Sequence, residues 1–78
     1  MKKWEITHAG TVITVENGAG GERLYVNREL QDEQIGLLAA RARLWGQLPT
    51  GETIKVSLGG NWGIHCRIFV DNRLVLSE

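Results

Sequence analysis

The chain has 78 residues, 42% of them hydrophobic and 23% charged, which gives room for one folded domain over residues 1–78 and excludes a multidomain protein or a disordered chain. Nine Lys and Arg residues balance nine Asp and Glu residues, so the basic surplus typical of nucleic-acid binders is missing. The single cysteine excludes an internal disulfide, and no apolar run reaches the ~18 residues of a membrane span. We therefore expect a cytoplasmic protein that contacts neither membrane nor nucleic acid.

The first half of the chain consists of short apolar segments separated by turn residues. Alternating apolar side chains predict a first strand over 4–8 and a second over 13–15, the second ending at the turn pair Asn17-Gly18. A further strand over 23–27 leads into a turn at Asn27-Arg28, after which the chain runs back. This half is therefore expected to form hairpins.

The segment from Asp32 to Gly46 allows two interpretations. Asp32 could cap a helix and Gly46 could end it, with apolar residues at helical spacing between them, namely Ile35, Leu38, Ala42 and Trp45. Against a helix, Gly36 lies in its first turn, and residues 40–45 alternate in character directly before a Pro-Thr-Gly turn. We expect a strand from about Leu38, with a short helix as the alternative.

The second half shows the clearest alternation. The run 53–58 places three apolar side chains on one face, and the run 64–70 places Cys66 among apolar residues. Asp71-Asn72 forms a two-residue turn into a last strand over 73–77. Taken with the first half, this pattern predicts an all-β fold, a small antiparallel β-sandwich of about eight short strands joined by hairpins.

One five-residue pattern occurs twice. Residues 23–27, Arg-Leu-Tyr-Val-Asn, match residues 67–71, Arg-Ile-Phe-Val-Asp, and each run follows a glycine-rich loop and precedes a turn. Either two equivalent hairpins face each other, or good strand-and-turn chemistry recurs by chance.

The stretch 54–74 resembles the Fas apoptotic inhibitory molecule family in its strand, its glycine-aromatic loop around Trp62, its long strand and its Asx turn. Residues 23–27 are similar to that family's aromatic strand before its first Asx turn. The two stretches lie within residues 23–74, a span of about two thirds of the chain, and the resemblance implies a two-sheet antiparallel β-sandwich that is not an enzyme and acts through protein contacts.

The side chains that could carry chemistry are few. His8, His65 and Cys66 are the candidates for a metal site, but adjacent strand residues point to opposite faces, and two histidines fall short of the ligands that zinc needs. The position of Cys66 predicts a buried, unreactive thiol. No phosphate-binding loop, nucleophile elbow or zinc-protease motif occurs, so we expect no enzyme, no metal and no cofactor.

Acidic residues crowd one segment, at Glu29, Asp32 and Glu33. Paired carboxylates can hydrolyse glycosides, but an acidic edge that prevents sheet-to-sheet aggregation is the stronger interpretation. Arg41 and Arg43 could pair with these acids, within the chain or in a partner.

Three tryptophans are more than so small a core needs. Trp45, Trp62 and Phe69 fall at loop or polar-face positions, and exposed aromatic rings mark protein interfaces or stack on sugars. With Arg67 they form the candidate interaction surface. We expect a non-catalytic protein-interaction module that binds a protein partner or itself as a homodimer; the alternative is a β-sandwich that binds a carbohydrate-like ligand.

Overall fold

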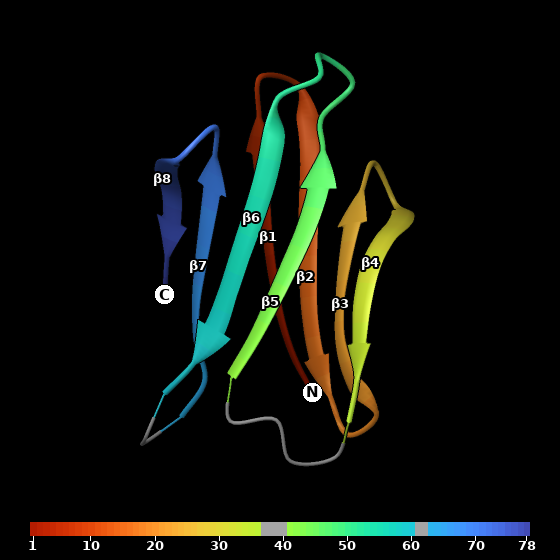
Figure 1. The fold of residues 1–78 in the computed structure, drawn as a ribbon, viewed down its shortest axis with the longest axis vertical. Helices are drawn as coiled ribbons and strands as arrows, with labels where there is room; N and C mark the ends of the chain where they lie inside the picture. The colour runs from red at the N-terminus through yellow and green to blue at the C-terminus, as the bar shows by residue number, and fades with distance from the viewer. Residues whose placement is uncertain (37–40, 61–62) are drawn as a thin grey trace.

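The computed structural model describes residues 1–36, 41–60 and 63–78, and its strands form two four-stranded antiparallel sheets (Figure 1). Sheet A has the order β1-β2-β3-β4 and sheet B the order β5-β6-β7-β8. The strands are β1 (Lys2–His8), β2 (Thr11–Gly18), β3 (Gly21–Val26), β4 (Glu29–Ile35), β5 (Arg41–Gln47), β6 (Thr53–Gly59), β7 (His65–Val70) and β8 (Arg73–Ser77). The predicted all-β sandwich of short strands joined by hairpins is confirmed. In these ranges no helix is long and apolar enough to cross a membrane.

The core lies between the two sheets, which overlap in Figure 1 with β5 and β6 in front of β1 and β2. Strands that cover a core on one face alternate buried and wet side chains, and β6 does so: Ile54, Val56 and Leu58 are buried while the residues between them are half-buried. Both sheets contribute to one apolar cluster: Trp4, Ile13, Val15, Leu24, Val26, Ala42, Leu44, Leu48, Ile54, Val56, Leu58, Cys66, Ile68 and Val70.

In the segment between Asp32 and Gly46, the described residues are strand except for Gly36. Asp32 lies in β4, and residues 41–47 form β5; residues 37–40, where the strand was expected to begin at Leu38, lie outside the described residues. The helix alternative is wrong for the described part. Asp32 caps no helix because it lies within β4. Its Oδ2 instead accepts a hydrogen bond from the backbone N–H of Trp45 in β5 (2.9 Å).

Two predicted turns are confirmed by backbone angles. Asn27, Arg28, Asp71 and Asn72 all have positive φ, as a two-residue hairpin turn requires. The third expected turn is wrong: Asn17 and Gly18 belong to β2 and pair with β3, so the chain turns two residues later, at Ala19-Gly20. Asn17 stays extended because its side chain donates to Glu22 Oε1 across the pair (3.3 Å).

The repeated five-residue pattern occupies equivalent positions. Residues 23–27 form most of β3 and residues 67–71 most of β7, the third strand of each sheet. The register shifts at the same place in both, between Leu24 and Tyr25 and between Ile68 and Phe69. The two hairpins therefore hold equivalent positions in the two sheets.

The residue that ends each repeat also makes the same contacts. Asn27 makes two hydrogen bonds with the backbone of Val12: its side-chain Oδ1 accepts from the Val12 N–H (3.0 Å), and its own N–H donates to the Val12 carbonyl (2.8 Å). Asp71 does the same with Thr53 (2.8 and 2.9 Å). Each third strand is thereby tied to the start of the second strand of its own sheet.

Candidate functional site

The outer face of sheet B holds three of the four residues predicted as an interaction surface. Trp45 projects from β5, and Arg67 and Phe69 from β7. These residues alternate with core residues, so they point away from the sandwich. Trp62 lies outside the described residues. The candidate site is therefore this outer face, on which β6 lies between the residues of β5 and those of β7.

An aromatic row crosses this face. Trp45 pairs with Lys55 of β6, Lys55 with Phe69, and Phe69 with Leu74 of β8. The Lys55 ammonium lies over both rings, 5.9 Å from the centre of Trp45 and 4.8 Å from that of Phe69, which is within cation–π range. Trp45 is 52% exposed and Leu74 53%. The row therefore presents apolar surface to solvent at both ends and a cation in its middle.

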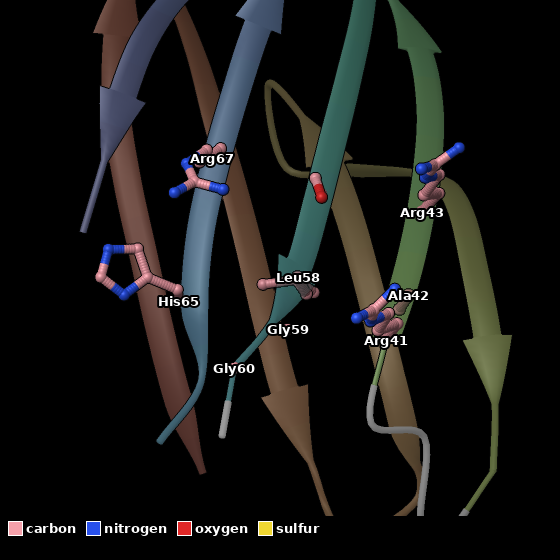
Figure 2. Close-up of a pocket in the computed structure, with 9 residues that line it drawn as sticks. Arg41, Ala42, Arg43, Leu58, Gly59, Gly60, His65 and Arg67 are labelled. Carbon is pink, nitrogen blue, oxygen red and sulfur yellow. The ribbon is translucent and has the colours of Figure 1, made fainter. Parts of the chain in front are cut away.

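Two basic rows lie beside the aromatic row. In the first, Arg43 pairs with Ser57 and Ser57 with Arg67. In the second, Arg41 pairs with Gly59 and Gly59 with His65. Arg41 and Arg43 come from β5, and His65 and Arg67 from β7, with β6 between them (Figure 2).

These rows enclose a hollow of about 430 Å³, which we call the basic hollow. It forms because β6 carries only small side chains here, Ser57 and Gly59, while the neighbouring strands carry long ones. Its lining residues are Arg41, Ala42, Arg43, Ser57, Leu58, Gly59, Gly60, His65 and Arg67. Among these described lining residues there are three arginines and no carboxylate.

The two halves of the chain differ in charge. Residues 1–35 contain four Lys and Arg and six Asp and Glu, a net charge of −2, whereas residues 36–78 contain five and three, a net charge of +2. The neutral total of the chain therefore conceals a basic surplus on the half that forms sheet B.

Two of the three acidic residues considered for hydrolysis, Asp32 and Glu33, are engaged in other contacts. Both oxygens of Asp32 accept backbone hydrogen bonds, from Glu33 and from Trp45 (2.9 Å each). The Glu33 carboxylate pairs with Arg23 at 3.1 Å on the outer face of sheet A. That is the one ion pair found over the described ranges 1–36, 41–60 and 63–78, so these acids do not pair with Arg41 or Arg43 within the chain.

The three candidate metal ligands are not brought together. His65 is exposed on the outer face of sheet B, while Cys66 is fully buried on the inner face. Within the part of the chain that the structure describes, no three His, Cys, Asp or Glu residues are close enough to hold an ion.

The Cys66 thiol lies in the core, as its position in the strand predicted. Desolvation by burial, with a smaller contribution from the negative charge of Glu78, raises the pKa of Cys66 from 9.0 to about 12. At neutral pH the group is a thiol, which is a poor nucleophile and a poor metal ligand.

Sequence reasoning missed the part that β6 plays in the site. Lys55 and Ser57 alternate with three buried residues, so their outward direction was readable from the sequence. Their partners were not, because the pairing of Lys55 with two aromatic rings and of Ser57 with two arginines depends on the register of three strands.

A comparison of the chain with protein-family models, curated proteins and solved structures finds no match.

Proposed function

We propose that this chain is a non-catalytic protein-interaction module that binds its partner with the outer face of sheet B. The observation that carries the proposal is the aromatic row lying beside the basic hollow, whose described lining holds three arginines and no carboxylate. Trp and Arg are the residue types most enriched among side chains that dominate protein interfaces.

The same face could in principle stack a sugar, the alternative raised by its aromatic residues. Sugar stacking needs a free ring face, and the Lys55 ammonium occupies one face of both Trp45 and Phe69. Phe69 is also half-buried. These contacts favour a partner that uses the cation together with the rings, and therefore favour a protein over a carbohydrate.

The resemblance to the Fas apoptotic inhibitory molecule family implies the same class of function, action through protein contacts. It remains a prediction. It adds no site residue to those above, because the part of the resemblance around Trp62 lies outside the described residues.

Self-association is a second form of the proposal, and the two edges of sheet B favour it. At β5 the backbone N–H groups of Trp45 and Gln47 donate to the side chains of Asp32 and Gln31 (2.9 and 3.2 Å), so this edge is covered. Strand β8 is the other edge; Leu74 on it is exposed, whereas Val75 and Leu76 are half-buried against the core. Uncovered apolar edges pair with other strands, so we propose that two copies join through β8.

Self-association is tested by sedimentation equilibrium over a range of concentrations. Leu74→Lys places a charge on the β8 edge and should lower the dimer fraction. Leu30→Lys is the matched control, since Leu30 holds the equivalent place in β4 and is similarly exposed (50% against 53%). A strict monomer at millimolar concentration would exclude the homodimer but not a different partner.

The binding face is tested by selection from a random peptide library displayed on yeast, with the purified protein as bait. Arg67→Ala and Trp45→Ala should each remove the captured peptides. Arg23→Ala, at the equivalent place in sheet A, should retain them. Peptides that still bind both Arg67→Ala and Trp45→Ala, or a selection that enriches no peptide, would contradict the proposal.

A further inference from the structure

We infer that the basic hollow binds an extended acidic peptide segment, with the partner's carboxylates seated between the arginines of β5 and β7. This inference rests on the proposed function and adds to it the chemistry of the partner.

The described lining of the hollow holds three arginines and no carboxylate. In sheet A the corresponding row is Lys3, Glu16, Arg23 and Glu33, in which basic and acidic residues alternate across all four strands. In sheet B the same four places hold Arg43, Ser57, Arg67 and Ser77. The basic positions are kept and both acids are replaced by serine. An outside carboxylate over Ser57 would supply the charge that Glu16 supplies in sheet A, and the serine hydroxyl could donate to it.

The spacing of the basic side chains also matches that of an extended peptide. Arg41 and Arg43 are two residues apart on one strand, so their Cα atoms are about 7 Å apart, and β5 and β7 lie about 10 Å apart on either side of β6. Acidic side chains at alternate positions of an extended peptide repeat at the same distance of about 7 Å. A peptide that runs along β6 therefore places successive carboxylates first at Arg43 and Arg67 and then at Arg41 and His65.

The area of the outer face also favours a peptide segment as the partner. The outer face of a four-stranded sheet with strands of about six residues measures about 20 by 20 Å, or about 400 Å². A standard interface between folded proteins takes about 800 Å² from each partner. The face is therefore better matched to a single peptide segment than to a second globular surface.

Single-stranded nucleic acid is the competing occupant, because it also carries repeated negative charge. It binds through phosphate contacts combined with bases stacked on open aromatic rings, and here Lys55 covers a face of both rings. The chain as a whole is neutral and its first half is acidic, which weakens attraction to a long polyanion. The observations favour the peptide.

The test is a fluorescence-polarisation titration with three labelled probes of equal length: a peptide that alternates Glu and Thr, one that alternates Gln and Thr, and oligo(dT). We expect the Glu peptide to bind, the Gln peptide to bind at least about tenfold more weakly, and added salt to reduce the difference. Ser57→Glu should lower the affinity for the Glu peptide by about tenfold, because it rebuilds in sheet B the row that sheet A already carries.

Thr7→Glu is the matched control, since it adds the same charge on an exposed residue of β1 and should leave binding unchanged. Circular dichroism of both variants checks that each is folded. Equal binding of the Glu and Gln peptides, or equal losses in Ser57→Glu and Thr7→Glu, would overturn the inference, and tighter binding of oligo(dT) would replace it with nucleic acid.

The library selection separates this failure from that of the proposed function. Captured peptides whose binding depends on Arg67 but which are not enriched in Asp and Glu would support the interaction module and contradict only the inference of an acidic partner. If no captured peptide depends on Arg67 or Trp45, both proposals fail.

Discussion

Sheets A and B share strand order, the two-residue turn between the third and fourth strands and the place of the register shift in the third strand, but their outer faces differ. The row in sheet A pairs Lys3 with Glu16, and Arg23 with Glu33. The row in sheet B sets its two arginines beside serines. Because one fold accepts both rows, the unbalanced charge of sheet B is not required for folding. A feature that the fold does not need is a good place to look for function.

The largest effect should come from the core that the two faces share. Leu24 and Ile68 hold equivalent places in β3 and β7, and both are fully buried. Leu24→Ala and Ile68→Ala should each lower the free energy of unfolding by about 2 to 5 kcal/mol. Urea unfolding followed by circular dichroism and by tryptophan fluorescence should show one shared transition in each variant. Two separate transitions would mean that the sheets are stabilised independently.

The next effect concerns the first residue of each third strand, Gly21 in β3 and His65 in β7. Gly21 has φ +136°, and an added Cβ would fall onto the backbone of Gln34. Gly21→Ala should therefore cost about 2 to 4 kcal/mol in urea unfolding. Gly20→Ala, where a Cβ meets open space, is the control and should change stability little. Similar losses of stability in Gly21→Ala and Gly20→Ala would show that crowding by the Gln34 backbone does not exclude a side chain at position 21. The equivalent position in sheet B holds His65.

The residues that end the repeats should cost less. Asn27→Ala and Asp71→Ala each remove a side-chain hydrogen bond to a strand backbone and place alanine at positive φ. We expect losses of about 1 to 2 kcal/mol, with Asp71 the larger because a carboxylate is the stronger acceptor. Thermal unfolding of Asn27→Ala and Asp71→Ala, each compared with the unchanged protein, measures these losses of stability. Asn27→Asp and Asp71→Asn keep the bond, so a large loss in either would argue against it.

Exchanging the charged rows should change stability only slightly. Glu16→Ser removes the acid between Lys3 and Arg23 and should destabilise by about 0.2 to 1 kcal/mol. Ser57→Glu places an acid between Arg43 and Arg67 and should stabilise by a similar amount. Both changes should shrink in high salt. Destabilisation by Ser57→Glu would show that the two rows are not interchangeable.

The last effect is absent at neutral pH. Cys66 in β7 and Glu22 in β3 hold equivalent buried places. Because burial raises the pKa of Cys66 from 9.0 to about 12, the unfolded chain releases this proton above pH 9.0 while the folded chain keeps it until about pH 12. Stability should therefore fall as the pH rises between these values. Cys66→Val should lose this part of the pH dependence; unfolding curves from pH 7 to 11 that fall in parallel for both proteins would contradict the shift.

Much of the fold was predictable because its determinants are local. The alternation of Ile54, Val56 and Leu58 with polar residues fixes which face of β6 is buried. Asp71-Asn72 fixes a turn, since both residue types tolerate positive φ. The turn expected at Asn17-Gly18 was wrong because Asn17 finds a partner in Glu22 across the sheet, and a glycine-rich run allows a turn at several places.

The candidate site was predictable in part. The outward direction of Trp45, Arg67 and Phe69 follows from strand alternation. Their common face and their grouping around Lys55 and the basic hollow follow from pairing between strands far apart in the chain. The neutral total charge was also a poor guide, because it averages two halves of opposite sign.

Each of the eight described strands pairs only with strands that neighbour it in the chain, and this has a consequence during synthesis on the ribosome. Sheet A is complete once β4 has emerged, before any strand of sheet B is available to cover it. Its apolar inner face, with Trp4, Ile13 and Leu24, then meets water or a chaperone until β6 and β7 follow. The nascent chain should therefore be most vulnerable to aggregation in the interval between the emergence of β4 and the emergence of β7.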